Sequence, residues 1–73
     1  MTITKHGKKR LKERLGLPKR AQNRHLEAVI RRGILYSREG WSKFKVVYNR
    51  FLYVFALDSG LKPVLVTTIP IDN

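Results

Sequence analysis

Residues 41–57 read WSKFKVVYNRFLYVFAL, and this stretch decides the fold. Two runs rich in aromatic and β-branched residues flank the pair Asn49 and Arg50. A gap of two residues between such runs is typical of a tight β-hairpin loop, in which asparagine tolerates the required positive φ better than arginine does. We therefore predict an antiparallel hairpin in which Tyr48 faces Phe51.

This register divides the hairpin side chains between two faces of a sheet, because successive residues of a strand point to opposite sides. One face is aromatic and apolar, and we expect it to be buried; it holds Phe44, Val46, Tyr48, Phe51, Tyr53, Phe55 and Leu57. The other face is mixed and can meet water; it holds Lys43, Lys45, Val47, Leu52, Val54 and Ala56.

Further strands are predicted on both sides of the hairpin. Residues 34–40 read ILYSREG and predict a short strand followed by a turn, and residues 58–62 read DSGLK and predict another turn. Residues 63–71, PVLVTTIPI, form the last predicted strand. Pro63 and Pro70 mark its two ends, because proline cannot donate a hydrogen bond within the ladder.

Two helices are predicted before the first strand, over residues 4–16 and 18–33. In the first helix, Leu11 and Leu15 lie four positions apart and therefore share one face, and Thr4 suits the N-cap. The second helix carries an apolar side made of Ala21, His25, Leu26, Ala28, Val29 and Ile30.

The chain is thus predicted to form one α+β domain over residues 1–73, helical over residues 4–33 and β-rich over residues 34–71. Two N-terminal helices pack on one face of a three- to four-stranded antiparallel sheet in this architecture. A chain of 73 residues without cysteine has a small core and no disulfide, so regular elements or a partner must stabilise it. With two histidines and no cysteine, we expect neither a structural metal ion nor another cofactor.

The composition also bears on location. The absence of cysteine fits the reducing cytoplasm. Residues 1–14 are basic and no apolar h-region follows them, and the longest apolar run, FLYVFAL, has seven residues where a membrane helix needs about 20. We expect a cytoplasmic protein that does not enter a membrane.

The charge is large and uneven along the chain. The formal net charge is +11; residues 1–32 carry eleven Lys or Arg against two acids, and residues 33–73 carry five against three. Such asymmetry indicates a polyanionic partner: nucleic acid first, an acidic protein second and an anionic membrane surface last. The alternative is that the charge serves solubility alone.

The first predicted helix carries the candidate catalytic residues His6, Arg10 and Arg14. Their spacing of four residues puts them in one stripe beside the leucine face. Arginine binds phosphate bidentately and stabilises charge that develops on it, and histidine moves protons near neutral pH. In a phosphodiester cleavage, the two arginines would hold the phosphate while His6 serves as acid or base. The alternative is a solvated basic face.

Other residues are candidates for contacts with nucleic acid. We predict phosphate-positioning roles, without base specificity, for Lys8, Lys9, Lys12, Lys19 and Arg20. The open sheet face and its rim offer a second candidate surface, made of Lys43, Lys45, Trp41 for base stacking, and Thr67 or Thr68 for a phosphate. Ordinary surface lysines and ordinary strand threonines are the alternatives. His25 is predicted to be a packed boundary residue rather than a catalytic one.

Several of these motifs together resemble a known group of proteins. A helix with His-x3-Arg-x3-Arg at His6, Arg10 and Arg14, a second helix ending in glycine, a hairpin and a last strand of the VTTIP kind are similar to small bacterial and phage proteins of the RelE-like and BrnT-like group. The resemblance covers about residues 4–71. It implies the barnase–colicin–RelE fold and a metal-independent ribonuclease toxin of a phage or mobile element, with an acidic antitoxin as partner.

The chain departs from this group at two places. Gly7 replaces the alanine of the helix motif, and the ending IPIDN has no basic or aromatic side chain after Thr68, where RelE-like toxins place catalytic groups. The expected site therefore moves from the sheet to the first helix. Two functions stay open: a small basic protein that cleaves RNA without a metal ion, or a non-enzymatic phage-type protein that binds nucleic acid or inhibits an acidic host protein. No glycine-rich phosphate loop, carboxylate pair or serine–histidine–aspartate set is present in the sequence.

Overall fold

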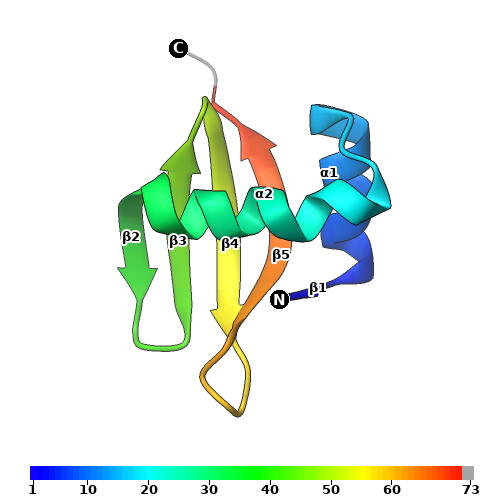
Figure 1. The fold of residues 1–73 in the computed structure, drawn as a ribbon. Helices are drawn as coiled ribbons and strands as arrows, with labels where there is room; N and C mark the ends of the chain where they lie inside the picture. The colour runs from blue at the N-terminus through cyan, green and yellow to red at the C-terminus, as the bar shows by residue number, and fades with distance from the viewer. Residues whose placement is uncertain (72–73) are drawn as a thin grey trace.

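The protein is described by a computed structural model that covers residues 1–71. Five strands form one sheet in the order β1-β5-β4-β3-β2, and both helices precede β2 in the chain (Figure 1). The α+β class predicted from the sequence is confirmed. The elements are β1 (Thr2–Ile3), α1 (Lys5–Leu15), α2 (Lys19–Arg32), β2 (Ile34–Glu39), β3 (Lys43–Tyr48), β4 (Phe51–Leu57) and β5 (Pro63–Pro70).

The β3–β4 hairpin has the predicted register. Tyr48 pairs with Phe51, and the pairing continues in step to Lys43 and Ala56. Asn49 and Arg50 both have positive φ, at 49° and 69°, which is the geometry of a two-residue hairpin turn. The arginine therefore adopts the left-handed conformation although a glycine is the usual residue there.

The sheet differs from the prediction in two respects: it has five strands rather than three or four, and one pair of strands is parallel. The added strand is β1, in which Thr2 pairs with Val64 and Ile3 pairs with Leu65. Two residues carry no alternation of apolar and polar side chains, so no sequence pattern could reveal this strand. The other neighbouring strands are antiparallel, as predicted.

Thr4 joins β1 to α1 and fastens the helix to the sheet. Its Oγ1 accepts the N–H of Gly7 at 3.0 Å, as an N-cap should, and donates to the carbonyl of Val66 on β5 at 3.1 Å. Its own N–H donates to the carbonyl of Leu65 at 3.0 Å. The predicted N-cap is confirmed, and its extra bonds to β5 determine where α1 starts relative to the sheet.

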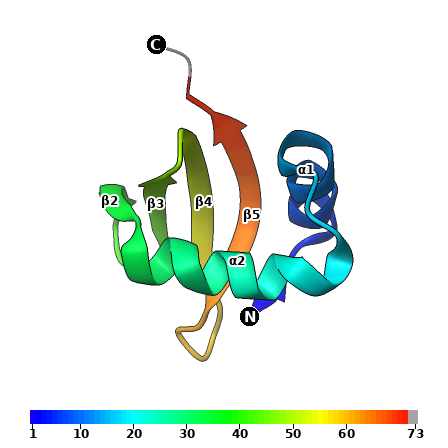
Figure 2. The same ribbon diagram turned by 45° about the horizontal axis from the view of Figure 1, so that its top comes forward.

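The core lies between the helices and one face of the sheet. Figures 1 and 2 show α2 crossing this face and α1 running beside β5. The predicted aromatic face is the buried one, since Tyr53 and Phe55 are fully buried. The buried apolar residues are Leu11, Leu26, Val29, Val46, Tyr53, Phe55 and Leu65. No helix of the described residues is long and apolar enough to cross a membrane.

Candidate nucleic-acid interface

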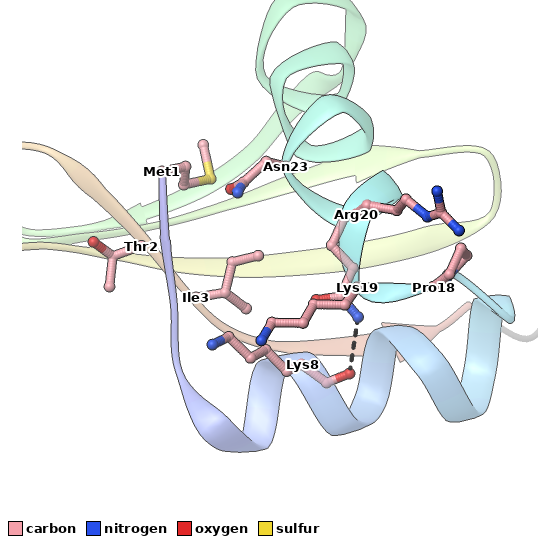
Figure 3. Close-up of a pocket in the computed structure, with 9 residues that line it drawn as sticks. Met1, Thr2, Ile3, Lys8, Pro18, Lys19, Arg20 and Asn23 are labelled. Atoms are coloured by element: carbon pink, nitrogen blue, oxygen red, sulfur yellow. Dashed lines mark hydrogen bonds between the residues drawn. The ribbon is translucent and has the colours of Figure 1, made fainter.

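A groove runs between the N-terminal segment, α1 and the start of α2. It has a volume of about 650 Å³ (Figure 3). A second hollow of about 510 Å³ adjoins it and shares Lys8, Pro18, Lys19 and Gln22 with it. We call the two together the basic groove, which is lined by Met1, Thr2, Ile3, Lys8, Lys9, Lys12, Pro18, Lys19, Arg20, Gln22 and Asn23.

The walls of the basic groove are held by the turn between the helices. Gly16 ends α1 in the left-handed conformation (φ 66°), with its N–H bonded to the carbonyls of the last turn. Gln22, only 4 % exposed, donates from Nε2 to the carbonyl of Lys8 at 3.4 Å and to that of Leu17 at 3.3 Å. The two helices therefore keep a constant spacing at this end.

Gln22 was not among the candidate residues from the sequence. It lies four positions before Leu26 and seven before Val29, both buried, so it occupies the apolar side of α2. A polar residue at such a position needs hydrogen-bond partners, because an unpaired buried amide is costly. A glutamine on the apolar side of α2 was therefore the sequence feature that could have indicated a hydrogen bond from α2 to a neighbouring segment, here α1 and the turn after it.

The structure brings together the five basic residues predicted to position phosphates. Figure 3 shows Lys8 and Lys19 extending from α1 and α2 in the same direction, toward Ile3, while Arg20 extends away from them. None of the described residues that line the basic groove is acidic. Of the five, only Lys9 lies within salt-bridge distance of a described carboxylate, that of Glu13 at 3.8 Å. The remaining ammonium and guanidinium groups therefore attract anions from solution.

The stripe of His6, Arg10 and Arg14 exists on α1, but protein groups already engage both arginines. Arg10 donates from Nε to His6 Nε2 at 3.3 Å and from Nη1 to Glu13 at 3.4 Å. Arg14 donates from Nη1 to the carbonyl of Thr68 at 2.6 Å, which ties α1 to β5. His6 and Arg10 thus share one exposed site, whereas Arg14 also serves as a link to the sheet.

His25 lies near the middle of α2 and contacts the sheet. Its Nε2 is 2.7 Å from the hydroxyl of Tyr53. Burial lowers the pKa of the His25 imidazole. Burial, and then the nearby Tyr48, raise the pKa of the Tyr53 hydroxyl far above its usual range. Both groups are uncharged near neutral pH, so the pair connects α2 to β4 as a packed boundary contact.

The second predicted surface lies away from the basic groove. Lys43 and Lys45 on β3 point to the open face, where Lys45 Nζ is 3.7 Å from the carboxylate of Glu39. Trp41 is 74 % exposed in the β2–β3 turn. Thr67 lies on the open face, half-buried, whereas Thr68 is fully buried and its hydroxyl has no partner among the described residues. β4 and β5 lie between β3 and the junction of the two helices (Figure 1). The stripe of His6, Arg10 and Arg14 does not line the basic groove either, so the candidate residues form three sets rather than one site.

The described residues hold no group of three or more histidine or acidic side chains that could bind a metal ion. Comparison of the chain with protein-family models, with curated proteins and with solved structures found no match.

Proposed function

We propose that this protein binds single-stranded RNA in the basic groove, with Lys8 and Lys19 on the backbone phosphates. One observation carries this proposal: two lysines from different helices extend into one groove whose described lining has no acid. Lysine acts on phosphate as a point charge, so these contacts position a strand without reading its bases.

The rest of the lining supports a nucleotide chain over a simple anion. Met1, Ile3 and Pro18 add apolar side chains to the lining of the groove, and a nucleotide likewise has an apolar base beside an anionic phosphate. A volume of about 650 Å³ lies within the range of roughly 300–1,000 Å³ found for small-ligand sites. It therefore suits unstacked nucleotides better than a duplex, which supports a single strand.

Removing two groove charges is expected to weaken RNA binding by about 10- to 30-fold near 0.1 M salt. In the variant Lys8→Gln/Lys19→Gln, two phosphate contacts are lost. The slope of log K against log salt should become less steep by about 1.4, because each contact on a single strand contributes about 0.7. Fluorescence anisotropy with a labelled single-stranded RNA at several salt concentrations measures both quantities.

The matched control is Arg50→Gln/Lys62→Gln, which removes the same charge at exposed residues of the β3–β4 and β4–β5 turns, outside both candidate surfaces. Its RNA affinity should fall by less than about 3-fold, as expected for general charge loss at distant sites. Equal losses in the two double variants would mean that RNA contacts the whole basic surface, and the groove would not be the site.

Cleavage of RNA is a second candidate function, favoured by the contact between Arg10 and His6. His6 Nε2 accepts from Arg10 Nε at 3.3 Å on an exposed helix face. If the guanidinium turns from the imidazole to a bound phosphate, it frees Nε2 to take the proton of the 2′-hydroxyl. The attack of the 2′-oxygen on phosphorus would expel the 5′-oxygen of the next nucleotide, which takes a proton from water, and leave a 2′,3′-cyclic phosphate.

If the protein cleaves RNA, labelled RNA incubated with it in EDTA is expected to yield 2′,3′-cyclic phosphate ends. His6→Ala should then slow the reaction by about 10²-fold or more, the usual contribution of a general acid or base. Circular dichroism checks the folding of the variant, and Lys62→Gln serves as the control. RNA that is bound but stays intact would leave binding as the function and exclude cleavage.

A further inference from the structure

The edge strand β2 exposes more apolar surface than the rest of the sheet. Ile34, Leu35 and Tyr36 are consecutive and are 73 %, 54 % and 66 % exposed. Because β2 is the last strand in the order β1-β5-β4-β3-β2, one side of its backbone has no neighbouring strand. At the opposite edge, β1 has two residues and α1 runs beside β5. Of the described strands, β2 therefore presents the long open edge.

Soluble proteins usually protect such an edge with charges or a bulge. In β2 the charges and the bulge lie only in the second half of the strand. The register with β3 shifts between Leu35 and Ser37, and Arg38 and Glu39 follow. The first half remains apolar and open, and an edge of this kind is a template for another strand.

A hollow beside this edge can accept a side chain. It has a volume of about 230 Å³ and lies between the end of α2 and the strands β2 and β3; its lining is Ile30, Gly33, Leu35, Arg38, Phe44 and Val46. The lining is apolar apart from Arg38, and no described carboxylate lies within salt-bridge distance of that guanidinium. The hollow thus fits an apolar side chain with a carboxylate next to it.

We propose that β2 and this hollow, together the β2 docking edge, bind an extended acidic and apolar segment of another protein, which joins the sheet as a sixth strand. The charge selects the occupant. Arg31 and Arg32 end α2 just before the strand, and Arg38 lies on the hollow, whereas the acid of the strand, Glu39, is paired with Lys45.

A second copy of this chain fits the edge poorly, because it would bring a net charge of +11 against +11. In strand addition, main-chain hydrogen bonds supply affinity and side-chain pockets supply specificity. An acidic segment would pair with both the open backbone and the guanidinium of Arg38, which no described carboxylate reaches. This proposal concerns a different surface from the basic groove and does not depend on RNA binding.

The test uses the full chain, ¹⁵N-labelled, and a capped peptide of repeating Val-Ser-Glu-Ser, in which valine and glutamate lie on the same face of an added strand. We expect the peptide to shift the backbone amide signals of residues 34–39. Leu35→Asp, which puts a negative charge into the hollow, should weaken peptide binding at least 10-fold. Leu61→Asp is the matched control, since it makes the same change at a leucine that is 61 % exposed in the β4–β5 turn, and it should change the affinity less than 3-fold.

Three results would overturn the proposal. The first is that the peptide shifts only signals of the basic groove, at Lys8 and Lys19. The second is that a peptide with proline in place of each serine, which has the same charge but cannot form a ladder, binds equally well. The third is that the free protein dimerises in sedimentation velocity and the signals of residues 34–39 change with its concentration, which would make the occupant a second copy.

Discussion

Replacing Gly33 with alanine is expected to cost more than the roughly 1–3 kcal/mol of ordinary overpacking. Gly33 links α2 to β2, and a Cβ atom there would lie far inside van der Waals contact of Val46 Cγ1 and of the carbonyl oxygen of Val29. It would also lie 3.2 Å from the carbonyl of Val47. The backbone is extended (φ −71°), so the glycine is needed for space and not for conformation.

None of these neighbouring atoms can move without loss of a hydrogen bond or of core packing. The carbonyl of Val29 accepts the N–H of Gly33 at 2.7 Å and closes the last turn of α2, and Val46 belongs to the core. Urea unfolding followed by circular dichroism measures the loss. Gly60→Ala is the control, because its nearest atom is Asp58 Oδ1 at an ordinary 3.5 Å, and it should stay within about 0.5 kcal/mol of wild type. Equal free energies of unfolding for the two variants would show that the junction of α2 and β2 can accommodate a Cβ atom at position 33.

Phe55→Ala is expected to cost about 3–5 kcal/mol, because it leaves a cavity the size of a phenyl ring. Phe55 is fully buried on β4, and its ring stacks on Phe44 with centroids 5.1 Å apart. A single core below roughly 70–80 residues seldom supplies more than 3–5 kcal/mol. The variant should therefore be largely unfolded at 25 °C, with the loss of its near-ultraviolet circular dichroism.

Trp41→Ala serves as the control for that experiment. It removes a larger aromatic side chain that is 74 % exposed, so we expect a change within about 0.5 kcal/mol. A Phe55→Ala protein that keeps a cooperative transition near that of wild type would contradict the core assignment.

The Phe55→Ala variant keeps the full charge of +11, so its RNA affinity measures how much binding the charge produces without the folded groove.

Much of the fold could be predicted because its signals are local. The hairpin follows from alternation on both sides of Asn49 and Arg50, and the register it implies is the one observed. Thr4 could be recognised as a cap, because its position relative to the helical pattern is enough. The half-buried His25 follows from its place in the periodic pattern of the second helix, and the exposed Trp41 follows from its position after Gly40 at the edge of a strand.

The candidate site was predicted as a set of residue types but not as an arrangement. No pattern in the sequence shows that Lys8 and Lys19 extend into one groove. Their placement depends on the left-handed Gly16, on the short turn after it, and on the hydrogen bonds of Gln22 to the carbonyls of Lys8 and Leu17. Arg14 was expected to be available to a phosphate, and its bond to the carbonyl of Thr68 lies 54 residues away along the chain.

The sequence by itself determined the two helices, the four longer strands and their apolar faces, because side-chain patterns repeat every two or every 3.6 residues within a single segment. It also determined where the charge accumulates, because that follows from composition alone. The tertiary structure alone decided that β1 adds a parallel strand, that β2 forms the open edge and that the lysines of two helices share a groove. Each of these depends on contacts between residues distant in the chain. Such contacts form only where packing and hydrogen bonding compensate the entropy of closing the loop between them, and no local pattern records that balance.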